Sequence, residues 1–342
     1  MSDFNPPLPP YPLQPPYPLP PAFPTPGPVY PMTFGQVLDR IFRLVRGNLS
    51  PFLAIGMLPF GIVIALEAVF AGVLYLAGVI PHPPAQPNPT TLVLTIVPLF
   101  ILFVPAMLFI YGLYYGATSY AALQADHDLK VTAAEAFRHA WSRIGRYAWL
   151  LLLRSLIVGL PIFVLAILIG VAALLVVYLT PNSNANSPVL FLLIPIGVLL
   201  YVGSLVYAAI MSLRYSLAFP VCVHEGITAG HALKRSGVLT NGAKGRIFLA
   251  LLIIYAIGYV CIMVMYLIGI FIAVIVGTAA SMGSLADASP LTIAMLVIGG
   301  LILFVVMLLW SALLMAAYSM AFAVFYRDQR LRKDGLMTSP AL

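Results

Sequence analysis

Charged side chains are scarce in this chain. Only 8% of its 342 residues are Asp, Glu, Lys or Arg, whereas a soluble domain carries about 25%. Hydrophobic residues make up 62% of the sequence, and the mean hydropathy is +1.04. A soluble fold of this length cannot hide so much apolar surface. The composition therefore excludes a soluble protein and predicts an integral membrane protein.

Cysteine is also rare, and a signal peptide is not visible. Cys222 and Cys261 are too few for a disulfide framework, so we expect two packing thiols. The first thirty residues lack the basic start and the continuous apolar core of a signal peptide. The net charge of +7 would suit a nucleic-acid partner, but the basic residues flank apolar runs. That position favours a membrane and no nucleic acid.

Long apolar runs, in contrast, are abundant. A helix needs about twenty apolar residues to cross a bilayer, and six runs reach that length. We therefore predict an all-α integral membrane protein with six transmembrane helices in a membrane domain of residues 33–326. The runs are approximately Pro51–Val79, Thr91–Leu123, Tyr147–Leu179, Val189–Val223, Ile247–Ala280 and Pro290–Tyr326.

Three polar segments with a shared pattern precede pairs of these runs. They begin at Thr33, Thr132 and Thr228, which are 99 and 96 residues apart. In the first two, Gln or Glu follows the Thr by three residues, which is typical of a helix capping box. Apolar residues then recur at helical spacing. We predict three tandem repeats of an amphipathic surface helix plus a helical hairpin, at about 33–130, 131–225 and 226–326.

The predicted surface helices differ in their faces. In the first, Arg40, Arg43 and Arg46 fall on the polar side. In the third, Ser236 and Gly237 stand where large residues would be expected. That helix is therefore predicted to lie close against a neighbour rather than dip into lipid.

The distribution of basic residues predicts the orientation. The connectors 81–90, 180–188 and 281–289 contain no Lys or Arg, whereas the polar segments and the C-terminus do. This asymmetry places both termini in the cytoplasm. Residues 1–32 are predicted to be a proline-rich, disordered cytoplasmic tail, either a simple tether or a docking site for a protein partner with an aromatic-lined groove. Residues 327–342 are predicted to be a short basic cytoplasmic tail.

Three charged residues, Glu67, Arg154 and Arg214, fall inside apolar runs. Charges at membrane depth are expensive and suggest a functional site. Glu67 is the deepest: it is either protonated, paired with one of the two arginines, or facing a polar cavity. Arg154 and Arg214 can also extend to the cytoplasmic interface.

Tyrosines mark the ends of the even-numbered runs. Tyr215 and Tyr318 each precede an acid, Glu225 or Asp328, by ten residues, and Tyr120 precedes Asp128 by eight. The tyrosines form either an interfacial aromatic belt or part of a shared site with the charged residues above.

Basic residues in the polar segments form a candidate collar for anionic lipid headgroups. Each basic group near an anionic leaflet contributes roughly 1 kcal/mol to binding. The candidates are Arg40, Arg43, Arg46, Arg138, Arg143, Arg146, Lys234, Arg235, Lys244 and Arg246.

No catalytic, cofactor or metal site is predicted. The segment 126–128 (Asp-His-Asp) places metal-ligand types together, as do His224, Glu225 and His231. The spacing of the two histidines does not put both rings on one helical face, and the HExxH pattern is absent from the sequence.

Several short segments resemble one group of prokaryotic multi-span proteins, those related to the membrane domain of glycerophosphoryl diester phosphodiesterases. The resemblance spans roughly Thr33 to Arg332 and implies a bacterial or archaeal plasma membrane. In the phosphodiesterases, catalysis belongs to a separate barrel domain with acidic metal ligands, which we do not expect here, so the activity is not carried over. The segments are Phe34-Gly-Gln-Val-Leu-Asp-Arg, Arg214-Tyr-Ser-Leu-Ala-Phe-Pro, Glu225-Gly, Ala232-Leu-Lys-Arg-Ser and Leu239-Thr-Asn-Gly.

Three hypotheses for function follow. The first is a non-enzymatic scaffold or a lipid- or envelope-associated factor of the cell membrane. The second is a small-molecule or lipid transporter with a path between the three hairpins. The third, an intramembrane enzyme, has the least support because a catalytic constellation is missing from the sequence.

Overall fold

The computed structural model describes residues 31–76, 89–179, 188–281 and 290–335. Within these ranges the helical fold class is confirmed, and six helices are long and apolar enough to cross a membrane. The chain is therefore a multi-pass, helical membrane protein. The candidate spans are Leu49–Leu76, Leu94–Asp126, Ile144–Ala172, Pro195–Glu225, Lys244–Ile272 and Val297–Asp334.

A short helix precedes each pair of long helices. This order has the form expected for surface helix plus hairpin, while the tandem repeat itself stays a prediction. The elements are α1 (Phe34–Gly47), α2 (Leu49–Leu76) and α3 (Pro89–Asp126); α4 (Ala133–Trp141), α5 (Ile144–Leu179), α6 (Pro188–Arg214) and the short α7 (Ala218–Glu225) that follows it in the same candidate span; and α8 (Ala229–Thr240), α9 (Lys244–Ser281) and α10 (Pro290–Asp334).

Capping boxes start the first two short helices, as the sequence predicts. Thr33 donates its N–H to Gln36 Oε1 over 2.8 Å and accepts the Gln36 N–H on its hydroxyl at 3.4 Å. Thr132 and Glu135 form the same pair of bonds at the start of α4. The backbone hydrogen bond from Thr132 lowers the pKa of the Glu135 carboxyl. These boxes satisfy donors that a helix N-terminus leaves free.

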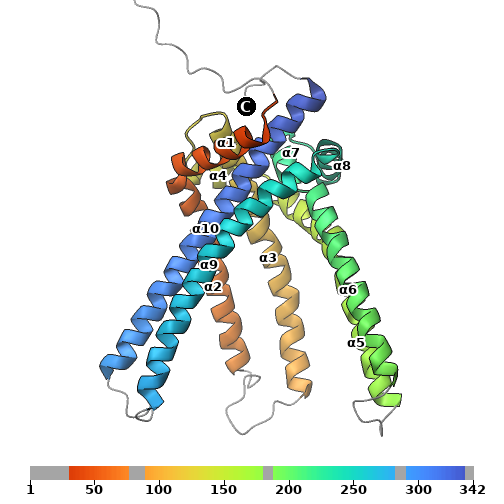
Figure 1. The fold of residues 1–342 in the computed structure, drawn as a ribbon, viewed down its shortest axis with the longest axis vertical. Helices are drawn as coiled ribbons and strands as arrows, with labels where there is room; N and C mark the ends of the chain where they lie inside the picture. The colour runs from red at the N-terminus through yellow and green to blue at the C-terminus, as the bar shows by residue number, and fades with distance from the viewer. Residues whose placement is uncertain (1–30, 77–88, 180–187, 282–289, 336–342) are drawn as a thin grey trace, which may run out of the picture.

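The helices meet at one end of the molecule and separate toward the other (Figure 1). Helices α1, α4, α7 and α8 gather at the first end, together with the C-terminal part of α10. We call it the basic end, because the polar segments with most of the Lys and Arg residues lie there. The three long pairs extend from it and diverge. The hydrophobic core of the described residues is concentrated toward this end and includes Phe52, Tyr147, Leu217 and Tyr326.

Glycines allow α3 and α5 to approach closely near the basic end. A Cβ added at Gly112 would lie 2.8 Å from the Ala148 backbone nitrogen, and one at Gly116 would strike the Tyr147 ring. Both glycines therefore fix the spacing of the two helices.

The third short helix, α8, lies close against the end of α6. Ser236 and Thr240 donate their hydroxyls to the Arg214 carbonyl oxygen, over 3.0 and 3.1 Å. These bonds satisfy a carbonyl that the helix C-terminus would otherwise leave free. The predicted close packing of α8 is confirmed.

Both predicted tails reach into the described structure only in part. Met32 is buried beside α10, while residues 1–30 lie outside the described ranges. At the other terminus, α10 continues to Asp334. Residues 327–334 thus continue the last helix, and residues 336–342 lie outside the described ranges.

Candidate functional site at the basic end

Asp126 is the central acid of the first of three polar networks at the basic end. It is the last residue of α3 and its side chain is 1% exposed. Arg40 of α1 donates Nε to Asp126 Oδ1 over 2.6 Å and also donates to the Asp126 carbonyl. Arg327 of α10 donates to the same carbonyl over 3.1 Å. Two arginines from distant segments therefore neutralise the acid and cap the end of α3.

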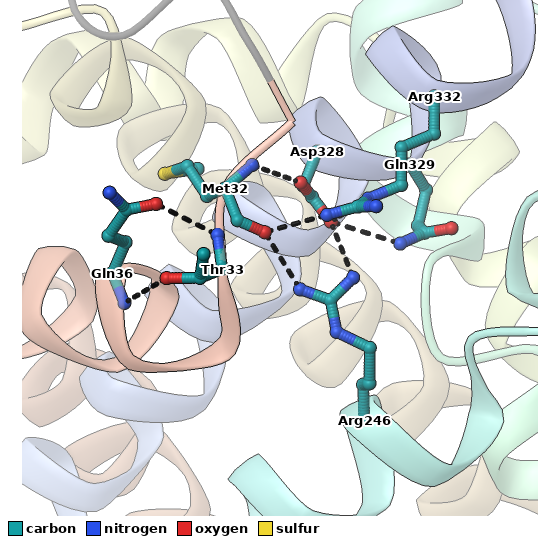
Figure 2. A network of polar contacts seen from close by, with 7 residues as sticks. All are labelled: Met32, Thr33, Gln36, Arg246, Asp328, Gln329 and Arg332. Atoms are coloured by element: carbon teal, nitrogen blue, oxygen red, sulfur yellow. Dashed lines mark hydrogen bonds and ion pairs between the residues drawn. The ribbon is translucent and has the colours of Figure 1, made fainter.

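Asp328 of α10 forms a second network, with Met32 (Figure 2). Its Oδ1 accepts the Met32 N–H at 2.9 Å, and its Oδ2 accepts Arg332 Nε at 2.9 Å and Arg246 Nη1 at 3.4 Å. The same two arginines donate to the Met32 carbonyl oxygen, over 2.6 and 2.9 Å. The start of the described chain is thus tied to α9 and α10 through both backbone groups of one residue.

Glu225, the last residue of α7, anchors the third network. Its Oε1 accepts the Tyr326 hydroxyl at 3.1 Å and Arg235 Nε at 3.5 Å. Arg235 of α8 also pairs with Asp334 near the end of α10. This network joins α7, α8 and α10. We call the three networks together the polar hub, consisting of Met32, Arg40, Asp126, Glu225, Arg235, Arg246, Tyr326, Arg327, Asp328, Arg332 and Asp334.

Neighbouring acids raise the pKa of two hub arginines, Arg40 and Arg235. Burial alone would lower the pKa of the Arg40 guanidinium, but Asp126 and Asp128 outweigh it and raise the pKa. Burial also opposes the charge of Arg235, and the hydrogen bond to Asp334 together with Glu225 raises its pKa. A buried carboxylate paired in this way is held as a structural counterion.

The prediction that Arg40 lies on the exposed polar face of the first surface helix is wrong. Its side chain is 9% exposed and points to Asp126, so the buried side of α1 includes an arginine beside Val37, Ile41 and Leu44. The acid expected at the end of the second run was Asp128. The buried acid there is Asp126, while Asp128 is exposed, has a φ of 58° and lies 3.6 Å from Arg40 Nη2.

The candidate collar residues divide into two groups. Arg40, Arg235 and Arg246 belong to the hub, and Arg146 donates to the Gly226 carbonyl at 2.5 Å. The others form no ion pair with a described carboxylate, except that exposed Arg43 pairs with Asp39 at 2.5 Å. Those in the second group are Arg43, Arg46, Arg138, Arg143 and Lys234, which are exposed, and Lys244, which is partly buried.

The three charges in the apolar runs are not brought together into a site. Glu67 lies on the exposed side of α2 and forms neither a hydrogen bond nor an ion pair with any described residue. Arg154 on α5 is partly buried and lacks a carboxylate partner within the described ranges. Arg214 ends α6 with its guanidinium 5.8 Å from the Tyr215 ring centre. The predicted pairing of Glu67 with either arginine does not occur among these residues.

The three predicted tyrosines also have separate surroundings. Tyr120 stacks on His139 of α4, with ring centres 4.1 Å apart and planes at 15°. Tyr215 lies under Arg214, and Tyr318 is partly buried on α10. Burial against α3 lowers the pKa of His139, and Arg143 adds to the effect. The tyrosines therefore do not line one common site.

The hub contains residues that the sequence did not single out as functional. Asp126, Arg327, Arg332 and Asp334 lie at or beyond the ends of apolar runs, where charge is expected for solubility alone. Their partners lie up to 300 residues away in the chain, as for Arg332 and Met32. One sequence signal could have found the hub: an acid lies at or just after the end of each even-numbered run. The arginines converge on these acids.

Comparison with protein-family models, with characterised proteins and with solved structures finds no match for this chain. The described residues also contain no group of three or more His, Cys, Asp or Glu side chains that could hold a metal ion. The geometry of the basic end is therefore the main guide to function.

Proposed function

We propose that this chain is a non-enzymatic, lipid-associated scaffold of a prokaryotic plasma membrane. The polar hub carries this proposal. Asp126, Glu225 and Asp328 each engage arginines from elsewhere in the sequence, so the hub fastens α3, α9 and α10 to the short helices α1, α7 and α8 at one end. A catalytic site would need a carboxylate or histidine free to react, and these carboxylates are already hydrogen-bonded and ion-paired.

Lipid association is supported by the basic residues that the hub does not use. Arg46 of α1, Arg138 of α4 and Lys234 of α8 are exposed and form no ion pair with any described residue. Exposed Trp141 of α4 lies near Arg138 in the sequence, and aromatic rings of this kind favour the membrane interface. These residues form a collar that binds anionic headgroups around the basic end.

The collar orients the molecule. Basic residues beside spans face the cytoplasm under the positive-inside rule, so the basic end and both termini are cytoplasmic in this proposal. The proline-rich tail then ends next to the hub, where Met32 is held, and is available to a cytoplasmic protein partner. The resemblance to the membrane domain of glycerophosphoryl diester phosphodiesterases supports the plasma membrane as the location.

The collar is tested by replacing Arg46, Arg138 and Lys234 together with Gln. Each charge near an anionic leaflet contributes about 1 kcal/mol, so the triple variant should retain at least tenfold less phosphatidylglycerol at low salt. High salt screens exposed charges, so the difference from the unmodified protein should disappear there. The measurement is mass spectrometry of the lipids that remain with the purified protein at two salt concentrations.

The matched control keeps every charge: Arg46→Lys, Arg138→Lys and Lys234→Arg. It should retain phosphatidylglycerol like the unmodified protein. Equal retention in the Gln variant would show that these residues only direct insertion, and the collar would have to be abandoned.

A transporter is the second candidate. Glu67 favours it, because an unpaired acid on a span is typical of ion-coupled transport. Uptake of a solute into proteoliposomes that depends on an ion gradient, and that is lost in Glu67→Gln, would establish this alternative over the scaffold.

A further inference from the structure

Two neighbouring arginines near the C-terminal end of α10 have donor groups that the hub does not use. Arg327 and Arg330 are three residues apart on this helix, and at that spacing the Cβ atoms are about 5–6 Å apart. Both residues are partly buried. Each is held by another helix through a single nitrogen, Nη1.

The two arginines have different partners. Arg327 Nη1 donates to the Asp126 carbonyl oxygen over 3.1 Å and lies 3.5 Å from Asp126 Oδ2. Arg330 Nη1 lies 3.1 Å from Nδ1 and 3.3 Å from Nε2 of the His224 ring on α7. A guanidinium can only donate, so one ring nitrogen has to accept and His224 is neutral in this contact. Arg330 therefore has no acid partner among the described residues.

The edge of the guanidinium formed by Nε and Nη2 is open in both residues. These nitrogens of Arg327 and Arg330 form no hydrogen bond with any residue in the described ranges. In Arg40, Arg235 and Arg332 the same two nitrogens donate to carboxylate or carbonyl oxygens. Two adjacent N–H groups on one edge can donate two parallel bonds to an oxyanion. The two open edges are thus suited to an anion.

The acids of the basic end do not neutralise Arg330. Asp334 lies four residues further along α10, a favourable spacing for an ion pair, but it pairs with Arg235 of α8. The hub contains five arginines and four carboxylates, and Arg330 adds a sixth positive charge. An anion from outside the chain would reduce this excess, and it can reach both arginines because they are partly exposed.

We propose that Arg327 and Arg330 bind one phosphate group of a ligand from outside the chain. Each guanidinium donates its Nε and Nη2 hydrogens to phosphate oxygens, while the Asp126 carbonyl and the His224 ring hold Nη1. A phosphate monoester has three terminal oxygens for two guanidinium groups, whereas a carboxylate has two oxygens in one plane. The site goes beyond the proposed scaffold and uses none of the collar residues.

The phosphate can belong to a soluble molecule or to a lipid headgroup, since both present the same oxygens. The last turns of α10 extend past α7 and α8 on the side away from the spans (Figure 1). This position is close to water and favours a soluble phosphate. The experiment separates the two sources by using one probe for each.

The soluble probe is inorganic phosphate, titrated calorimetrically into the full-length protein in detergent. Sodium chloride keeps the ionic strength constant, so general screening is equal in all titrations. Arg327→Gln and Arg330→Gln should each weaken the affinity at least tenfold, because each removes two charge-assisted hydrogen bonds. The lipid probe is phosphatidic acid, titrated into the delipidated protein and followed by native mass spectrometry.

Two further variants sharpen the test. Arg330→Lys keeps the charge but lacks the paired donors, so the affinity should fall about threefold to tenfold. This variant tests the site even where Arg330→Gln fails to fold. Lys333→Gln removes a charge from the same end of α10, where the amine already donates to the Val238 and Asn241 carbonyl oxygens. It should leave the affinity unchanged.

The two probes give distinct outcomes. Weaker binding of inorganic phosphate in the Gln variants supports a soluble ligand, and the same losses for phosphatidic acid alone support a headgroup. The inference is overturned if neither probe binds in a way that depends on these arginines. It is also overturned if Lys333→Gln weakens binding as much as Arg330→Gln, or if Arg330→Lys binds like the unmodified protein. The collar variant contains neither arginine, so its result is independent.

Discussion

Helix α1 carries two Arg–Asp pairs in opposite surroundings. Arg40 and Asp126 are 9% and 1% exposed, whereas Arg43 and Asp39 are 70% and 71% exposed. An exposed pair gains little because water screens it and two long side chains must be fixed. A buried pair does not stabilise strongly by itself, but removal of one partner leaves a charge in a dry site. An Arg–Asp pair therefore affects stability differently on the buried and the exposed side of the same helix.

Asp126→Asn is expected to destabilise the protein by about 3–5 kcal/mol, because buried Arg40 loses its counterion. The matched control, Asp39→Asn, should cost less than about 0.5 kcal/mol. Thermal and denaturant unfolding of the purified variants in detergent measures both. Replacing the pair with apolar residues, Arg40→Met with Asp126→Leu, should be less harmful than Asp126→Asn alone. Equal effects of Asp126→Asn and Asp39→Asn would show that burial of the pair does not matter.

At the scale of elements, the contact of α3 with α5 depends on two glycines. Gly112 meets the backbone of Ala148, and Gly116 meets the Tyr147 ring. A side chain can rotate away from an added methyl group, but a helix backbone cannot without moving the helix. Gly112 is therefore the stricter of the two positions.

Gly112→Ala should destabilise the protein by about 1–3 kcal/mol, because the added methyl group forces α5 away from α3. Gly61→Ala on α2 is the control, since a Cβ there meets nothing within 4 Å. It should be neutral or stabilising by up to about 1 kcal/mol, because Ala favours a helix over Gly. Unfolding in detergent compares the two. A stable Gly112→Ala would mean that the helices tolerate a wider spacing.

The sequence predicts these elements well where the signal is local. Run length identifies the six spans, and a Thr followed by Gln or Glu identifies the capping boxes. Hydrophobic periodicity failed at Arg40, because it assigns every charge to the polar face and cannot see a buried acid 86 residues away. The spacing after Tyr120 pointed to Asp128 rather than Asp126, because the choice between two nearby acids depends on where α1 and α10 lie.

At the scale of the whole molecule, different interactions hold the two ends. At the basic end, the hub and the core bind all three helix pairs together. Along the spans, between 0% and 28% of the most apolar window is buried inside the protein. Lipids therefore cover most of the remaining apolar surface and form part of the folded assembly. Stability at the basic end depends on ion pairs and core packing, whereas separation of the pairs along the spans depends on the surrounding bilayer.

The orientation of this assembly can be tested with single cysteines in a background where Cys222 and Cys261 are replaced by Ser. Asn241, between α8 and α9, is exposed at the basic end, and Asn184 belongs to a connector outside the described residues. Because basic residues beside spans stay in the cytoplasm, an impermeant maleimide should label Asn184→Cys and spare Asn241→Cys in intact spheroplasts. Permeabilised spheroplasts should show both labelled, which controls for reactivity. Labelling of Asn241→Cys alone in intact spheroplasts would show the opposite orientation and place the hub and the collar at the outer leaflet.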